Sequence, residues 1–241
     1  MYNIPEKYKK ESVINKENFI PKEETAQNKK KIRENLKKVR LKYQIDRDIP
    51  NLIDKNYNIQ VIMILEVELK SMKYVEYINE VFQRILKGYV IIKYICDDNV
   101  ALGYGYKRLN KQDKNEIVLE DSFVTEEFEE MFLFDNYLLY EKYLNFNNIK
   151  NKNNKLEFYM ENMVKAYIIS NRDKLREYKI ILDSNIYYSL ESTFKLYKIV
   201  VDIVDINIRL KNKKITGEKM ELNKKLVSLN KELEVLLDGR N

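Results

Sequence analysis

Histidine is absent from the 241 residues, and cysteine, proline and glycine are scarce. Without imidazole, serine and cysteine hydrolases that depend on a histidine base are excluded, and so are the usual zinc sites. The single cysteine, Cys96, can form neither an internal disulfide nor a zinc-binding cluster, and its place in the apolar run 90–96 predicts a buried side chain. Any catalysis must therefore use carboxylates, lysine, tyrosine or a magnesium-like ion.

Two further absences exclude other classes of protein. The five glycines form no Gly-rich turn before a helix, so the chain lacks both a nucleotide P-loop and a dinucleotide-binding motif. No run approaches the roughly 20 apolar residues that cross a bilayer, and the first ten residues are polar. We therefore expect a cytoplasmic protein that does not itself hydrolyse ATP.

The residues that are present are basic and sufficiently apolar to form a core. Lys and Arg exceed Asp and Glu by six, and hydrophobic residues make up 44% of the chain. A basic surface attracts nucleic acid, because the binding releases counterions from the phosphates. Lys, Asn, Ile and Tyr are enriched together, however, which an AT-rich coding bias also produces, so both explanations stay open.

The pattern of apolar residues predicts an α+β protein: a small mixed β-sheet with packed helices, followed by a mainly helical C-terminal region that ends in a coiled-coil-like helical hairpin. Predicted helices cover 25–44, 75–86, 128–144 and 156–170, and predicted strands cover 59–69, 89–96, 100–109 and 116–119, with a tight turn at 97–99. These elements divide the chain into an extended arm (1–24), a sheet domain (25–125), a helical region (126–190) and a hairpin (191–241), with a boundary near Lys150.

The most regular stretch lies near the C-terminus, where apolar residues alternate in steps of three and four. The predicted partner-binding residues are Leu222, Leu226, Leu229, Leu233 and Leu236. A second heptad-paced stretch covers 196–210, and the break at 211–217 between the two predicts an antiparallel helical hairpin. Pairing between two chains to form a homodimer is the alternative.

The sharpest candidate for chemistry is the end of the strand 59–69. Glu66, Glu68 and Lys70 share one face, because side chains alternate along a strand. The order acid-x-lysine is typical of metal-dependent nucleases, in which a carboxylate holds Mg²⁺ and the lysine positions water. A second acid would be needed, and the upstream candidates are Asp46, Asp48 and Asp54. The alternative is a strand whose charged end is simply solvated.

Two groups of residues are candidates for contact with nucleic acid. One is the basic face of the first predicted helix, and the other is an aromatic and basic strand face; together they comprise Lys29, Lys30, Arg33, Lys37, Tyr104, Tyr106 and Arg108. A solvated helix face and a half-buried packing face are the competing interpretations. Gly103 and Gly105 lie on the opposite strand face, where they allow a helix to approach closely.

Four stretches together resemble the prokaryotic family of domain of unknown function 4391. They are FIPK at 19–22, IQVIMILEVELK at 59–70, GYKR at 105–108 followed by FVTE at 123–126, and EKMELNKKLVSLNKELE at 218–234. The sequence departs from the family pattern at Glu127-Phe128 and Lys87-Gly88, which indicates a divergent member. The resemblance implies no established activity.

The resemblance also implies a context, because members of this family tend to be encoded beside helicases and DNA methyltransferases in restriction or phage-defence clusters. Three hypotheses follow. The first is an accessory subunit that binds such a protein partner and contacts nucleic acid. The second is a nuclease, with Mg²⁺ as its only expected cofactor. The third is a self-assembling structural protein.

Overall fold

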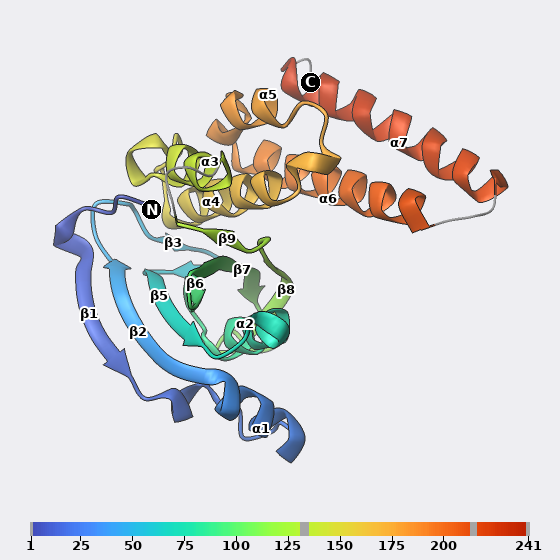
Figure 1. Ribbon diagram of the computed structural model, residues 1–241. Helices are drawn as coiled ribbons and strands as arrows, with labels where there is room; N and C mark the ends of the chain where they lie inside the picture. Colours follow the sequence, from blue (N-terminus) through green and yellow to red (C-terminus); the bar gives the residue numbers. More distant parts are fainter. Residues whose placement is uncertain (1, 131–134, 213–215, 240–241) are drawn as a thin grey trace.

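The computed structural model describes residues 2–130, 135–212 and 216–239. Its centre is a seven-stranded sheet in the order β1-β2-β5-β6-β7-β8, in which the short β9 also pairs with β7 (Figure 1). The strands are β1 (Lys9–Ile14), β2 (Leu36–Ile45), β5 (Ile62–Leu69), β6 (Tyr89–Cys96), β7 (Asn99–Leu109), β8 (Ile117–Val124) and β9 (Phe128–Glu129). A separate pair joins β3 (Leu52–Ile53) to β4 (Asn58–Ile59).

One pair of neighbouring strands in the sheet is parallel, and the other pairs are antiparallel. The parallel pair is β5 and β6, and α2 (Val75–Ile85) connects them across one face of the sheet. Glu66 lies opposite Lys93 in this pair, and opposite Arg40 in the antiparallel pair of β5 with β2. The register therefore surrounds the charged end of β5 with basic residues from both neighbours.

Helices cover both faces of the sheet. Against one face lie α2 and α1 (Ala26–Asn35), and against the other lies the helical C-terminal region. That region consists of α3 (Asp135–Leu144), α4 (Lys155–Ser170), α5 (Tyr178–Asp183), α6 (Leu190–Asn212) and α7 (Thr216–Leu237). Short 3-10 turns lie at Glu6–Tyr8, Lys16–Phe19, Met72–Tyr74, Phe146–Asn148, Arg172–Lys174 and Ile186–Tyr188. The fold class predicted from the sequence is confirmed.

Each face of the sheet has its own hydrophobic core. Leu65, Val67 and Leu69 of β5 pack with α1 and α2, whereas Ile62 and Ile64 point to the core that contains α4. Gly103 and Gly105 lie under α2, as expected. A Cβ atom at Gly103 would lie 2.2 Å from Oδ1 of Asn79, so the absence of a side chain permits the close approach of the helix.

The predicted helix 25–44 is wrong in its second half, because α1 ends at Asn35 and Leu36–Ile45 form β2. The spacing of Ile32, Leu36, Val39 and Tyr43 fits a helix. The stretch also contains apolar residues at every second position from Val39 to Ile45, which fits a strand equally well. Pairing with β5 decides between them, and a bulge between Leu41 and Tyr43 shifts the apolar side chains from one core to the other.

Several other elements differ in extent from the prediction. The N-terminal arm contributes the edge strand β1 and buries Tyr2, Tyr8 and Phe19. The strand predicted at 116–119 extends from Ile117 to Val124. Of the helix predicted at 128–144, residues 128–129 form β9, 131–134 lie outside the described residues, and α3 begins at Asp135.

The boundary predicted near Lys150 lies within the larger hydrophobic core. Residues on both sides of it pack together, from the β-sheet to α7. Glu161 of α4 accepts hydrogen bonds from the backbone amides of Lys150 and Asn151. Along 2–130, 135–212 and 216–239, we find no helix with the length and apolar character needed to cross a membrane.

Candidate functional site

The end of β5 carries an ion-pair network on the sheet face that points away from α1 and α2. The Arg40 guanidinium lies 2.6 Å from a Glu68 carboxylate oxygen and 3.6 Å from one of Glu66. Lys42 lies 3.7 Å from Glu66 and 3.1 Å from Glu11 of β1. The hydrogen bond to Glu11 raises the pKa of Lys42 above its ordinary value, despite partial burial. The sequence does not predict the contacts of Arg40 and Lys42 with these acids, because it predicts a helix for the segment that forms β2.

The three upstream acids do not join this network. Ile45 pairs with Ile62, so Asp46, Asp48 and Asp54 follow β2 at the opposite end of β5 from Glu66 and Glu68. Asp48 accepts a hydrogen bond from the Tyr8 hydroxyl at 2.8 Å and lies 2.9 Å from Lys7. Asp54 accepts hydrogen bonds from the backbone amides of the turn that follows it.

The network as arranged does not fit a magnesium ion. Mg²⁺ takes oxygen ligands in an octahedral arrangement, usually from one or two carboxylates and water. Glu66 and Glu68 offer such oxygens, but Arg40 is ion-paired with both carboxylates and Lys42 with that of Glu66. Among the residues that the structure describes, no three acidic or cysteine side chains form a group that could hold a metal.

The basic face predicted on the first helix is largely paired with acids of the same chain. Arg33 makes a bidentate contact with Glu17, at 3.1 Å and 2.8 Å. Lys30 lies 3.8 Å from Glu34, and Lys37 lies 3.7 Å from Asp97. Lys29 donates a hydrogen bond to the backbone carbonyl of Lys22. These four residues therefore offer less free charge than the sequence indicates.

A second basic group lies where the C-terminal end of α1 meets the end of β5. Nζ of Lys31 and Nζ of Lys73 lie 5.7 Å and 5.4 Å from the centre of the Tyr74 ring. The Asn35 side chain holds the two segments together, because it donates to the Ser71 carbonyl at 2.8 Å and accepts from the Ser71 amide at 2.9 Å. We call Lys31, Lys70, Lys73 and Tyr74 the α1/β5 basic surface.

The predicted stacking face on β7 is part of the core. Tyr104 is fully buried, and its hydroxyl lies 2.9 Å from that of Tyr2, so it cannot stack on a nucleic-acid base. Tyr106 packs against Phe194 of α6, and its hydroxyl lies 2.7 Å from that of Tyr57. Arg108 pairs with Glu120 on β8 at 2.5 Å. The packing interpretation explains these residues because α4 and α6 cover this face.

The C-terminal helices form the predicted hairpin, with α7 as the outermost helix (Figure 1). Leu233 and Leu236 are buried at its base, whereas Leu222, Leu226 and Leu229 are only half-buried. On the same helix, Met220 and Val227 leave 58% and 69% of their surface in solvent. The leucine seam therefore closes at the base of the hairpin and is partly open toward its tip.

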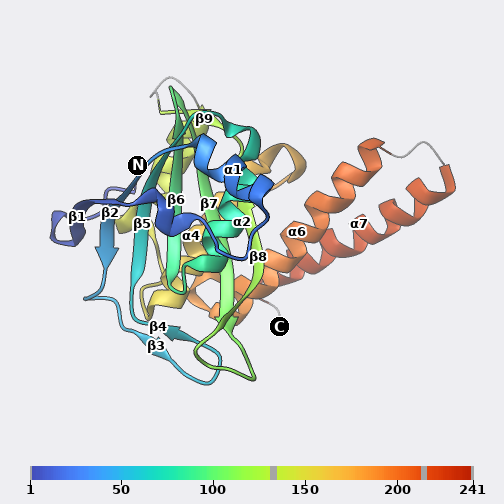
Figure 2. The same cartoon turned by 90° about the horizontal axis from the view of Figure 1, so that it is seen from below.

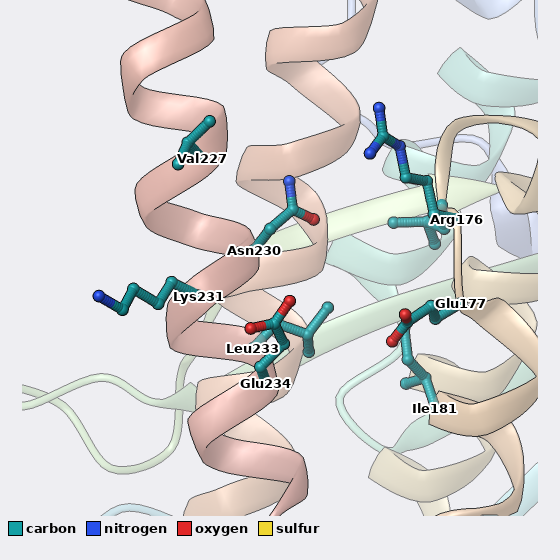
Figure 3. Close-up of a pocket in the computed structure, with 9 residues that line it drawn as sticks. Arg176, Glu177, Ile181, Val227, Asn230, Lys231, Leu233 and Glu234 are labelled. Atoms are coloured by element: carbon teal, nitrogen blue, oxygen red, sulfur yellow. The ribbon is translucent and has the colours of Figure 1, made fainter.

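A groove runs between α7 and residues 172–181, and we call it the hairpin groove (Figure 3). It consists of two adjoining hollows that share Leu175, Arg176 and Asn230. Apolar side chains in it are Leu175, Ile181, Ile203, Leu226, Val227 and Leu233. The polar and charged side chains are Arg172, Asp173, Lys174, Arg176, Glu177, Tyr178, Asn207, Lys211, Asn230, Lys231 and Glu234. An apolar strip with a polar rim is the usual composition of a protein interface.

Comparison with protein families gives one match that spans nearly the whole chain. A family model described as domain of unknown function DUF4391 matches residues 2–233. The chain belongs to the DUF4391 family. The matched region includes the sheet, the α1/β5 basic surface and most of the hairpin. No curated protein and no solved structure matches this DUF4391 chain.

Proposed function

We propose that this DUF4391 protein is an accessory subunit that binds a protein partner through its C-terminal hairpin. The partly open seam of α7 supports the proposal, because Val227 and Met220 stay exposed while the leucines beside them are half-buried. A helix of a partner lying in the hairpin groove would cover Val227, which lines that groove. The family resemblance directs attention to a helicase or DNA methyltransferase as that partner.

The shape of the molecule supports the same function. The hairpin extends away from the sheet, while its base stays in the main core through Leu233 and Leu236 (Figure 2). Ion pairing between Lys195 of α6 and Glu232 of α7, at 3.8 Å, adds a contact between the two helices near this base. Because the hairpin is already folded and fixed at one end, binding of a partner to it does not require the loss of conformational entropy that folding would cost.

Co-expression with a helicase and with a DNA methyltransferase, the two kinds of partner that the family resemblance implies, tests the proposal. The variant Val227→Asp should fold normally, because the side chain is exposed, and should no longer co-purify with either protein. Ser228→Asp introduces the same charge on another, exposed flank of α7 and should retain the partner. If the wild type retains neither protein, or if both variants behave like the wild type, the proposed docking role is wrong.

The main competing outcome of that experiment is self-association. Light scattering of the purified chain separates a monomer from a homodimer, and Val227→Asp should leave a monomer unchanged. A dimer that Val227→Asp dissociates would replace the accessory role by the self-assembling structural protein predicted as the third hypothesis.

A magnesium-dependent nuclease is the second candidate function. The observation in its favour is that Glu68 lies near the end of β5 and is followed by the exposed Lys70, which belongs to the α1/β5 basic surface. It requires Arg40 to leave the Glu68 carboxylate. Incubation of DNA and RNA with the protein and MgCl₂ tests it: cleavage that Glu68→Gln and Lys70→Met both abolish supports the nuclease, and intact substrates exclude it under those conditions.

A further inference from the structure

We infer that the α1/β5 basic surface binds the phosphate backbone of a nucleic acid. Lys31, Lys70, Lys73 and Tyr74 come from segments about 40 positions apart in the chain, and the fold brings them to one place. This inference concerns the end of the molecule opposite the hairpin and does not depend on the partner proposed above (Figure 1).

Within the described residues, the lysines of this surface form no ion pair with an acid. The ammonium groups of Lys31 and Lys73 lie over the Tyr74 ring instead. Lys70 and Lys73 are exposed, and Lys31 is half-buried. The ammonium groups of Lys31 and Lys73 lie against the same ring, and the backbone of Lys70 is bonded to Asn35 at the same junction. Like charges gathered in this way repel one another, and a phosphate group would relieve that repulsion.

The surface is also held in place by the fold rather than by flexible side chains alone. Asn35 is buried and makes two hydrogen bonds to the backbone of Ser71, while the Lys70 amide donates to the Asn35 carbonyl at 2.9 Å. The Tyr74 ring contacts Lys31 of α1 and Lys73 of the turn after β5, and so restricts the motion of both side chains. Placing the charges before binding reduces the entropy lost when nucleic acid is bound.

The paired lysines and arginine of α1 extend this surface. Lys30 and Arg33 lie on the same short helix as Lys31, and their pairs with Glu34 and Glu17 are exposed. Exposed pairs of this kind are weak, so a polyanion can compete for the cations. The primary contacts that we assign are nevertheless the three lysines without acidic partners.

Fluorescence anisotropy tests the inference with three labelled probes of about 20 nucleotides: double-stranded DNA, single-stranded DNA and single-stranded RNA. Three phosphate contacts on duplex DNA correspond to a salt slope of about −2.7, or about 40-fold weaker binding between 50 and 200 mM salt. The triple variant Lys31→Gln, Lys70→Gln, Lys73→Gln should lose that part of the slope and bind at least 10-fold more weakly at 50 mM salt.

A second triple variant provides the matched control. Lys10→Gln, Lys111→Gln and Lys198→Gln remove the same charge from exposed positions on β1, the loop after β7 and α6. It should keep most of the wild-type affinity and the full salt slope. Far-UV circular dichroism confirms that both variants are folded. The inference is overturned if no probe binds the wild type at 50 mM salt, or if the two triple variants weaken binding equally.

Discussion

Replacing Glu161 by Gln should destabilise the protein strongly, because Glu161 holds the helical region together around α4. Its carboxylate is fully buried and accepts hydrogen bonds from the backbone amides of Lys150 and Asn151, at 2.9 Å and 2.7 Å. It also pairs with Lys165, which is 98% buried by side-chain surface and lies 4.9 Å from the centre of the Tyr187 ring. The Gln side chain has the same shape but leaves the Lys165 ammonium without a counter-charge.

The expected loss follows from the cost of an unpaired buried charge. Breaking a buried pair by removal of one partner costs about 3–5 kcal/mol. With a urea m-value of about 3 kcal/mol per M, this loss lowers the midpoint of unfolding by about 1–2 M. The double variant Glu161→Gln, Lys165→Met should recover part of the loss, because both charges are then gone.

Urea unfolding followed by circular dichroism at pH 7 and pH 9 measures these effects. Burial lowers the pKa of Lys165, and loss of Glu161 should lower it further. Between the folded and unfolded pKa values the unfolded chain binds more protons, so the stability of Glu161→Gln should rise with pH more steeply than that of the wild type. A loss below about 1 kcal/mol, with no difference in pH dependence, would refute the assigned role of Glu161.

Two further predictions concern the sheet. Gly103→Ala should lower the free energy of unfolding by about 1–3 kcal/mol, because the added Cβ would overlap Asn79. The control Gly217→Ala should be neutral or slightly stabilising, because Gly217 has open space around it in α7. Equal thermal unfolding curves for the two variants would contradict this prediction. Burial lowers the pKa of Lys107 to about 7, while its Nζ donates to the carbonyls of Leu86 and Gly88. The folded state therefore loses this proton above pH 7, where the unfolded lysine keeps it, and stability should rise by about 2 kcal/mol between pH 7 and 9. Lys107→Met should remove that rise, and a rise that persists in the variant would assign it to other groups.

The sequence predicts best those elements whose signals are local. The spacing in 75–86 identifies α2 to within one residue, and β6 agrees with its predicted bounds because a continuous apolar run precedes a short polar turn. Asp97 adopts a φ of 53° in that turn, which an aspartate tolerates well. The two-helix hairpin is equally visible, because its heptads need no information from elsewhere in the chain.

The remaining features depend on contacts between distant segments. Residues 36–45 fit both periods, and only pairing with β5 makes them a strand. For the same reason the sequence does not predict that Arg40 pairs with Glu68. That pair occupies the carboxylate that the acid-x-lysine motif would offer to Mg²⁺. The contacts of Lys31 and Lys73 with Tyr74 likewise arise from the fold, since no sequence spacing relates α1 to the turn after β5.

The hairpin and the α1/β5 basic surface lie at opposite ends of the molecule, and one experiment on the assembled complex tests both proposed roles together. In a measurement of DNA bound and partner retained, Val227→Asp should lose the partner but keep the affinity of the isolated chain for DNA. The Lys31, Lys70, Lys73 triple variant should keep the partner and lose its own contribution to DNA binding. If each variant impairs both properties to the same extent, or neither variant impairs either, the two-ended arrangement is contradicted.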